Sequence, residues 1–138
     1  MKKKLSCVLL VDDDYVTNFL NTKVLEQAKV TEHIEVKLNG QEALEFLTNK
    51  EHHTDAAPNL ILLDLNMPVM DGWEFLQAYH EESLDQKNKS NIILLSASAN
   101  PDDVKRAKNI PFVCGFKTKP LTSEVLEDIM NDYFEDYL

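Results

Sequence analysis

The sequence has few cysteines and few glycines. Cys7 and Cys114 are the two cysteines among 138 residues, and they lie in separate apolar runs without the spacing of metal ligands. We therefore expect buried free thiols rather than a metal site. Gly40 and Gly72 adjoin expected helix starts, so a glycine-rich loop that cradles phosphate is not predicted.

Basic residues are also scarce. Lysine and arginine number 14, against 24 aspartates and glutamates, and the formal net charge is -10. Nucleic-acid affinity comes largely from basic side chains that neutralise phosphates, so this balance predicts no nucleic-acid partner.

Long apolar runs are missing. No run approaches the roughly 20 residues that a membrane span needs. The basic start MKKKLSCVLLVDDD stops at three aspartates without a small-residue cleavage site, so it is predicted to be a strand rather than a signal peptide. We expect a cytoplasmic protein that is not associated with a membrane.

What the sequence does have is an alternation of strand-length apolar runs and segments of helical spacing. The apolar runs are LSCVLLV (5–11), IEVKL (34–38), NLILLDL (59–65), NIILLSA (91–97) and PFVCGF (111–116). After the first run, apolar residues recur every four positions at Val16, Leu20, Val24 and Ala28. After the last run, one helical face carries Leu126, Ile129, Met130, Tyr133, Phe134 and Tyr137. Helix starts are indicated at Asn39, Asn100 and Thr122.

Five strand–helix units with Val-, Ile- and Leu-rich strands predict an α/β fold whose parallel sheet is covered by helices on both faces. A chain of 138 residues fits one domain, and we find no repeat, low-complexity tract or interdomain linker. The polar segments 48–58 and 80–90 are expected to be surface loops or frayed helix ends.

Polar side chains follow the ends of the predicted strands, where ligands of parallel sheets bind. They are Asp12, Asp13 and Asp14 after the first run, Asp64 in the third, Ser96 at the end of the fourth and Lys119 just past the fifth. Most have a simple alternative role as a helix cap, a turn residue or a solvated charge. Asp64 does not, because an ionised carboxylate inside LILLDL is costly unless it meets a charge or a metal.

Together these residues supply what phosphoryl transfer needs. Carboxylates can hold a hard cation, one carboxylate can act as the nucleophile, and a lysine and a hydroxyl can stabilise phosphoryl oxygens. The acidic run is therefore predicted to hold a divalent cation, Mg2+.

Four stretches carry a resemblance to a known family. VLLVDDDYVTNFL, PNLILLDLNMPVMDGWEFL, ILLSAS and GFKTKPLT, in this order and spacing, resemble the receiver domain of two-component response regulators of the chemotaxis-regulator-like type. The resemblance covers about residues 5–135. It implies a flavodoxin-like (βα)5 doubly wound sheet with strand order 2-1-3-4-5. It also implies a single domain over 1–138 with no output domain, and no enzymatic activity beyond its own phosphorylation and dephosphorylation.

The resemblance also implies roles for residues. Asp64 is expected to be the phosphoacceptor, and Asp12 and Asp13 the acidic pair. Asp13, Asp64 and the backbone carbonyl of Asn66 are expected to bind Mg2+ directly, with Asp12 acting through water. Ser96 and Lys119 are expected to contact the phosphoryl group, with a cis Lys119–Pro120 peptide and a small Ala97 that leaves the approach open.

The implied switch couples Ser96 to an aromatic ring at Phe116, which has no hydroxyl here. The implied donor is a sensor histidine kinase or a phosphotransfer protein. Output is expected through contacts with an unknown downstream protein, on the face formed by the helix after Asn100, the fifth strand and the helix after Thr122.

Three alternatives stay open. Asp14 extends the acidic pair to a triplet and either competes for the metal or caps the first helix, of which we favour the cap. Asp12, Asp14 and Val16 also fit the DxDx[TV] start of haloacid-dehalogenase-like phosphohydrolases, although this assignment leaves Asp64 unexplained. A degenerate receiver that only binds a partner is the third alternative.

Overall fold

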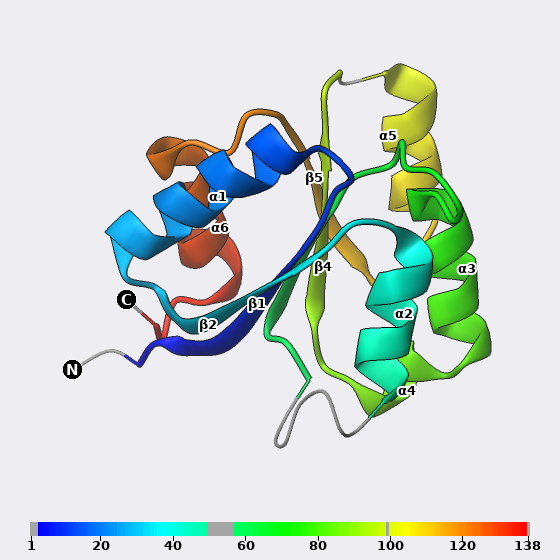
Figure 1. Cartoon of the computed structure of the whole chain (residues 1–138), viewed down its shortest axis with the longest axis horizontal. Coiled ribbons are helices and arrows are strands. Elements are labelled where there is room, and N and C mark those ends of the chain that lie inside the picture. The colour runs from blue at the N-terminus through cyan, green and yellow to red at the C-terminus, as the bar shows by residue number, and fades with distance from the viewer. Residues whose placement is uncertain (1–2, 50–56, 99, 138) are drawn as a thin grey trace.

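The computed structural model describes residues 3–49, 57–98 and 100–137, which form five strands and six helices (Figure 1). The strands are β1 (Leu5–Val11), β2 (Thr31–Lys37), β3 (Leu60–Leu63), β4 (Asn91–Ser96) and β5 (Val113–Thr118). The helices are α1 (Tyr15–Ala28), α2 (Gly40–Thr48), α3 (Gly72–Glu81), α4 (Leu84–Lys87), α5 (Pro101–Lys108) and α6 (Ser123–Tyr133).

All five strands are parallel and their order is β2-β1-β3-β4-β5, which confirms the predicted fold class and topology. Helices α1 and α6 cover one face of the sheet, and the other helices cover the opposite face (Figure 1). Successive residues of β1 alternate between the two hydrophobic clusters: Leu9 and Val11 pack with α2 and α3, whereas Val8 and Leu10 pack with α1 and α6.

The predicted helix starts are confirmed by their caps. The side chain of Asn39 accepts a hydrogen bond from the N–H of Glu42, and Thr122 accepts one from the N–H of Val125. Asn100 caps α5 in the same way through the N–H of Asp102. These contacts satisfy donors that the first turn of a helix leaves unpaired.

The bounds of β2, β3, β4 and β5 differ from the predicted runs, most clearly in β2 and β5. β2 begins at Thr31, three residues before the predicted run, because this edge strand pairs only with β1 and its polar residues can stay in water. β5 begins at Val113 and continues to Thr118, beyond the predicted end at Phe116, because its ladder with β4 pairs Ser96 with Thr118. The positions of the apolar residues do not indicate the longer start of β2 or the longer end of β5.

Helix α1 lies where the apolar spacing predicted a helix, but most of the predicted apolar face points outward: Val16, Leu20 and Ala28 are exposed, whereas Val24 packs against the core. The residues that it buries are Asn18, Asn21 and Leu25. Its exposed large apolar side chains are Tyr15 (82% exposed), Val16 (61%), Phe19 (54%) and Leu20 (52%). We call these four residues the α1 surface patch.

Three further expectations need correction or fall outside the structure. The polar segment 80–90 is not only a loop, since it contains α4 with Leu84 buried in the core. Cys7 and Cys114 are free thiols as predicted, but both are only partly buried. Residues 50–56 of the polar segment 48–58 lie outside the described residues.

In the described part of the chain, no helix combines the length and the apolar character that crossing a membrane requires.

Candidate functional site

The carboxyl ends of the parallel strands bring the predicted polar residues to one edge of the sheet. β1 and β3 are in register at Val11 and Leu63, so the residues that follow them are neighbours. Asp64 directly follows the last residue of β3 rather than lying inside the strand as predicted. Its N–H still donates to the carbonyl of Val11 at 2.9 Å, which holds the residue in line with the sheet.

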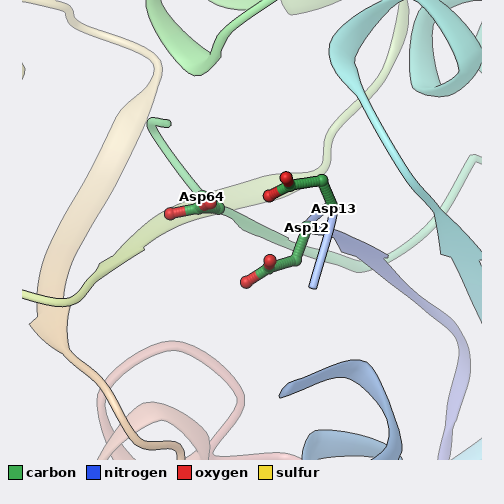
Figure 2. A group of neighbouring side chains, drawn as sticks. All are labelled: Asp12, Asp13 and Asp64. Carbon is green, nitrogen blue, oxygen red and sulfur yellow. The ribbon is translucent and has the colours of Figure 1, made fainter. Parts of the chain in front are cut away.

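Three carboxylates meet at this edge. Ligand oxygens of Asp12, Asp13 and Asp64 all lie within 4.8 Å of one another, with Asp12 and Asp64 buried and Asp13 exposed. Their side chains point to the same side (Figure 2). A set of three carboxylate oxygens fits a hard divalent cation, because Mg2+ prefers oxygen ligands and commonly keeps several waters.

Lys119 provides the positive charge beside this group. Its Nζ lies 2.6 Å from Oδ2 of Asp12 and 3.3 Å from Oδ1 of Asp64. Burial acts to lower the pKa of Lys119, but the hydrogen bond and charge of Asp12, together with Asp64, raise it above its ordinary value. The Lys119–Pro120 peptide is cis, as the resemblance implied.

Asp12 is held from three directions. Its Oδ1 accepts from the N–H of Asp14 at 2.9 Å, its Oδ2 accepts from Lys119, and its backbone carbonyl accepts from Nδ2 of Asn18 at 2.8 Å. No motif of the sequence pointed to Asn18. The available signal was its spacing with Asn21 and Leu25, which places all three on one face of α1.

The environment of Asp64 disfavours its ionised form. Burial, followed by the negative charge of Asp12, raises the pKa of Asp64 above its ordinary value. Lys119 and a hydrogen bond from the backbone N–H of Asn66 act in the opposite direction without reversing the shift. The expected role of the Asn66 carbonyl as a metal ligand stays a prediction.

Asp14 lies outside the three-carboxylate group. It occupies the N-cap position of α1, is exposed, and accepts a hydrogen bond from the hydroxyl of Thr17. The Thr17 hydroxyl lowers the pKa of Asp14 below its usual value. This position agrees with the preferred interpretation of Asp14 as a cap residue, although its carboxylate bonds to a side chain rather than to the helix backbone.

Ser96 and Phe116 lie on neighbouring strands. Ser96 is buried at the end of β4, and its Oγ is 3.4 Å from the N–H of Ser98. Phe116 pairs with Leu94 and is half-buried. It lines a cavity of about 220 Å³ between α5 and β5. Ala97, beside Ser96, is exposed.

The matching sequence family agrees with this geometry. The family model described as the response regulator receiver domain matches residues 8–131 of this chain. The match includes the three carboxylates, Ser96, Phe116 and Lys119.

Individual proteins are also similar. The probable methanogenesis regulatory protein FilR2 of Methanothrix harundinacea is 29% identical over 131 residues, which cover 95% of this chain and 83% of that protein. The response regulator Rcp1 of Synechocystis is 36% identical over 98 residues, covering 70% of this chain and 65% of that protein. The chain spans about half the length of three further curated relatives. A crystal structure of a two-component response regulator from Cytophaga hutchinsonii superposes with a TM-score of 0.86 at 33% identity, covering 96% of this chain and 99% of that one.

Proposed function

Because the chain belongs to the response regulator receiver family, we propose that its Asp64 accepts a phosphoryl group from a phosphohistidine and thereby changes the contacts of the domain. The donor is a sensor histidine kinase or a phosphotransfer protein. Receiver domains are signalling domains rather than conventional enzymes, and the catalysis proposed here is limited to the modification of Asp64 itself.

One observation carries the assignment of Asp64. Its carboxylate is buried at a strand end, 3.3 Å from the Lys119 ammonium and beside the carboxylates of Asp12 and Asp13. A structural ion pair needs only one carboxylate per lysine. The excess of buried negative charge is therefore better explained by a site that receives a cation and a phosphoryl group.

The reaction is a direct exchange of bonds at phosphorus. A carboxylate oxygen of Asp64 forms a bond to phosphorus, while the bond from phosphorus to a ring nitrogen of the donor breaks. The donor ring, which carries a proton on its other nitrogen, leaves as neutral imidazole. Lys119 balances the charge of the new acyl phosphate, and Ser96 offers it a hydroxyl donor.

Asp13 and Asp64 are proposed as direct ligands of Mg2+, together with the Asn66 carbonyl. Asp12 is proposed to act through water, because its oxygens already accept from Lys119 and from the backbone of Asp14. When bound, the cation would supply positive charge that offsets the negative charge of the carboxylates and of the phosphoryl group.

Output is proposed to pass through the face formed by α5, β5 and α6. Phe116 lies on this face, and the cavity beside it lets a rotamer change alter the surface between α5 and β5. The downstream protein, a cytoplasmic location and the absence of a nucleic-acid partner are part of the proposal. They rest on the sequence and its net charge of -10.

The alternative hydrolase hypothesis is not supported. The family match is to receiver domains, and Asp14, which the hydrolase would use with Asp12, is exposed and bound to Thr17. Turnover of a generic phosphomonoester by the purified protein would be needed to restore that hypothesis.

The decisive experiment incubates the protein with Mg2+ and acetyl phosphate, then locates the added mass by peptide mapping. We expect one phosphoryl group on Asp64 and none in Asp64→Asn. Asp14→Asn is the matched control, because it removes a neighbouring carboxylate outside the group and should be phosphorylated as wild type. Incorporation at another residue in Asp64→Asn would overturn the proposal.

A further inference from the structure

A second pocket lies away from the carboxylates, between α3 and the end of α5. It has a volume of about 450 Å³, within the range of about 300–1,000 Å³ that is usual for small-ligand sites. Apolar side chains line much of it, including Trp73, Leu76, Ile110, Pro111 and Phe112. None of the residues proposed for phosphorylation lines this pocket.

One wall of the pocket consists of two stacked side chains, and each of their residue types occurs once in the chain. Trp73 is its single tryptophan and Arg106 its single arginine. The guanidinium of Arg106 lies over the indole of Trp73, 4.3 Å from the ring centroid. Cation–π contact of this kind holds the planar guanidinium flat while its N–H groups at the edge remain available.

Arg106 has no carboxylate partner among the described residues, although the chain carries 24 acidic residues. Guanidinium groups bind planar carboxylates and similar anions through paired hydrogen bonds. The free edge of Arg106 therefore offers an anion site at a mostly apolar pocket.

A second stack makes another part of the lining. The rings of His80 and Phe112 are nearly parallel, with an interplanar angle of 11° and centroids 5.9 Å apart. Among the described residues, Asp85 is the one carboxylate that lines the pocket, and it is engaged by His80, with Nδ1 and Oδ2 3.0 Å apart. Phe112 also stacks on Tyr79, so the pocket combines aromatic rings that are already stacked on neighbouring side chains with one cation that lacks an acidic partner.

We propose that this pocket binds a small planar aromatic anion, with its ring among the aromatic side chains and its acidic group on Arg106. Edge-to-face contacts with these rings and the apolar lining favour an aromatic guest, and the unpaired guanidinium selects a negative one. The site is independent of phosphorylation, because its lining comes from α3, α4, α5 and the segment before β5 rather than from the carboxylate edge.

Trp73 lines the pocket, so its fluorescence can report the binding of a ligand there. Anilinonaphthalene sulfonate carries a planar naphthalene ring and a sulfonate, and it absorbs where tryptophan emits, so its binding should quench Trp73. Phenylnaphthylamine has the same rings without the sulfonate and tests the aromatic contribution alone. We expect Arg106→Ala to weaken binding of the sulfonate about tenfold or more, and binding of phenylnaphthylamine less than about twofold.

Lys105→Ala is the matched control, because it removes one positive charge from the neighbouring position of α5, outside the pocket lining. It should leave both affinities unchanged. Arg106→Lys should lose part of the selectivity for the anion, because an ammonium lacks the planar pair of donors. Phe19→Ser, on the exposed side of α1, should leave the quenching of Trp73 unaltered.

Equal losses for both probes in Arg106→Ala, or an equal loss of sulfonate binding in Lys105→Ala, would overturn the proposal. So would displacement of the probe by an acidic aromatic peptide at lower concentration than by free naphthoate, since that result assigns the pocket to a protein partner. Melting curves of each variant establish that the fold is retained. Asp64→Asn should bind both probes like wild type, which separates this inference from the proposed function.

Discussion

Replacing Lys119 with methionine should destabilise the metal-free protein strongly. The substitution keeps the length of the side chain but removes the ammonium that Asp12 and Asp64 share. Both carboxylates are buried, with 6% and 8% of their side-chain surfaces exposed. Without the lysine they remain as two buried like charges.

The magnitude follows from the distances. With an effective dielectric constant of about 20, Coulomb's law gives about 6 kcal/mol for the contact at 2.6 Å and about 5 kcal/mol for the one at 3.3 Å. Much of this attraction offsets the cost of taking the charges out of water. Breaking a buried ion pair costs about 3–5 kcal/mol. The Lys119 side chain keeps 18% of its surface exposed, so water can enter and we expect a loss of about 3 kcal/mol.

Urea denaturation at pH 7.5, in EDTA and then in Mg2+, measures this effect. Mg2+ should restore more stability to Lys119→Met than it adds to wild type, because a bound cation stabilises the native state and relieves the unpaired carboxylates. Lys117→Met is the control, since Lys117 lies two residues earlier, in β5, and takes part in none of the ion pairs described. A loss below about 1 kcal/mol in EDTA would refute the reasoning, because it would mean that the carboxylates do not depend on Lys119.

Three further predictions concern other residues. Burial and the charge of Asp12 raise the native-state pKa of Asp64, so its ionisation costs stability. In EDTA, Asp64→Asn should therefore be more stable than wild type at pH 7.5. Thermal melting should show that this advantage shrinks as the pH falls through the native pKa. Phe116→Ala should be phosphorylated normally, but hydrogen exchange in α5 should no longer respond to phosphorylation; an undiminished response would show that the signal takes another route. Burial, and then the charge of Glu35, raises the pKa of Cys7 to about 11. Alkylation of Cys7 at pH 8 should therefore be about a hundredfold slower than that of a free thiol, and it should accelerate up to pH 11. A rate like that of glutathione would contradict the raised pKa.

Sequence patterns predicted the sheet well because a strand that is buried on both faces is recognisable as a run of apolar residues. β1 has the predicted bounds, Leu5–Val11, since both of its faces are covered and every position from Val8 to Val11 is buried. Edge strand β2 was placed less accurately, because Thr31 and Glu32 gain nothing from being apolar there. Helix α1 shows the limit of periodicity: the spacing of Val16 and Leu20 identified a helix, but it did not reveal which side faces the core.

The carboxylate group was accessible to sequence reasoning because parallel strands place their carboxyl ends together. Asp12, Asp13 and Asp64 could be expected near one another without knowing any distance. The closer contact of Lys119 with Asp12 than with Asp64 depends on side-chain conformation, which no pattern reports. The pocket of Trp73 and Arg106 was missed for a similar reason, since these two residues lie 33 positions apart in the sequence.

Any partner that contacts the α1 surface patch would meet a surface whose response to solvent differs from that of the acidic edge beside it. Apolar association strengthens with warming from low temperature and with excluded salts such as sulfate, whereas attraction between exposed charges weakens as ions screen it. A surface that presents both kinds of contact side by side can hold an association nearly constant while ionic strength changes. Raising the salt concentration would then change the relative contributions of apolar association and charge attraction more than it changes their total.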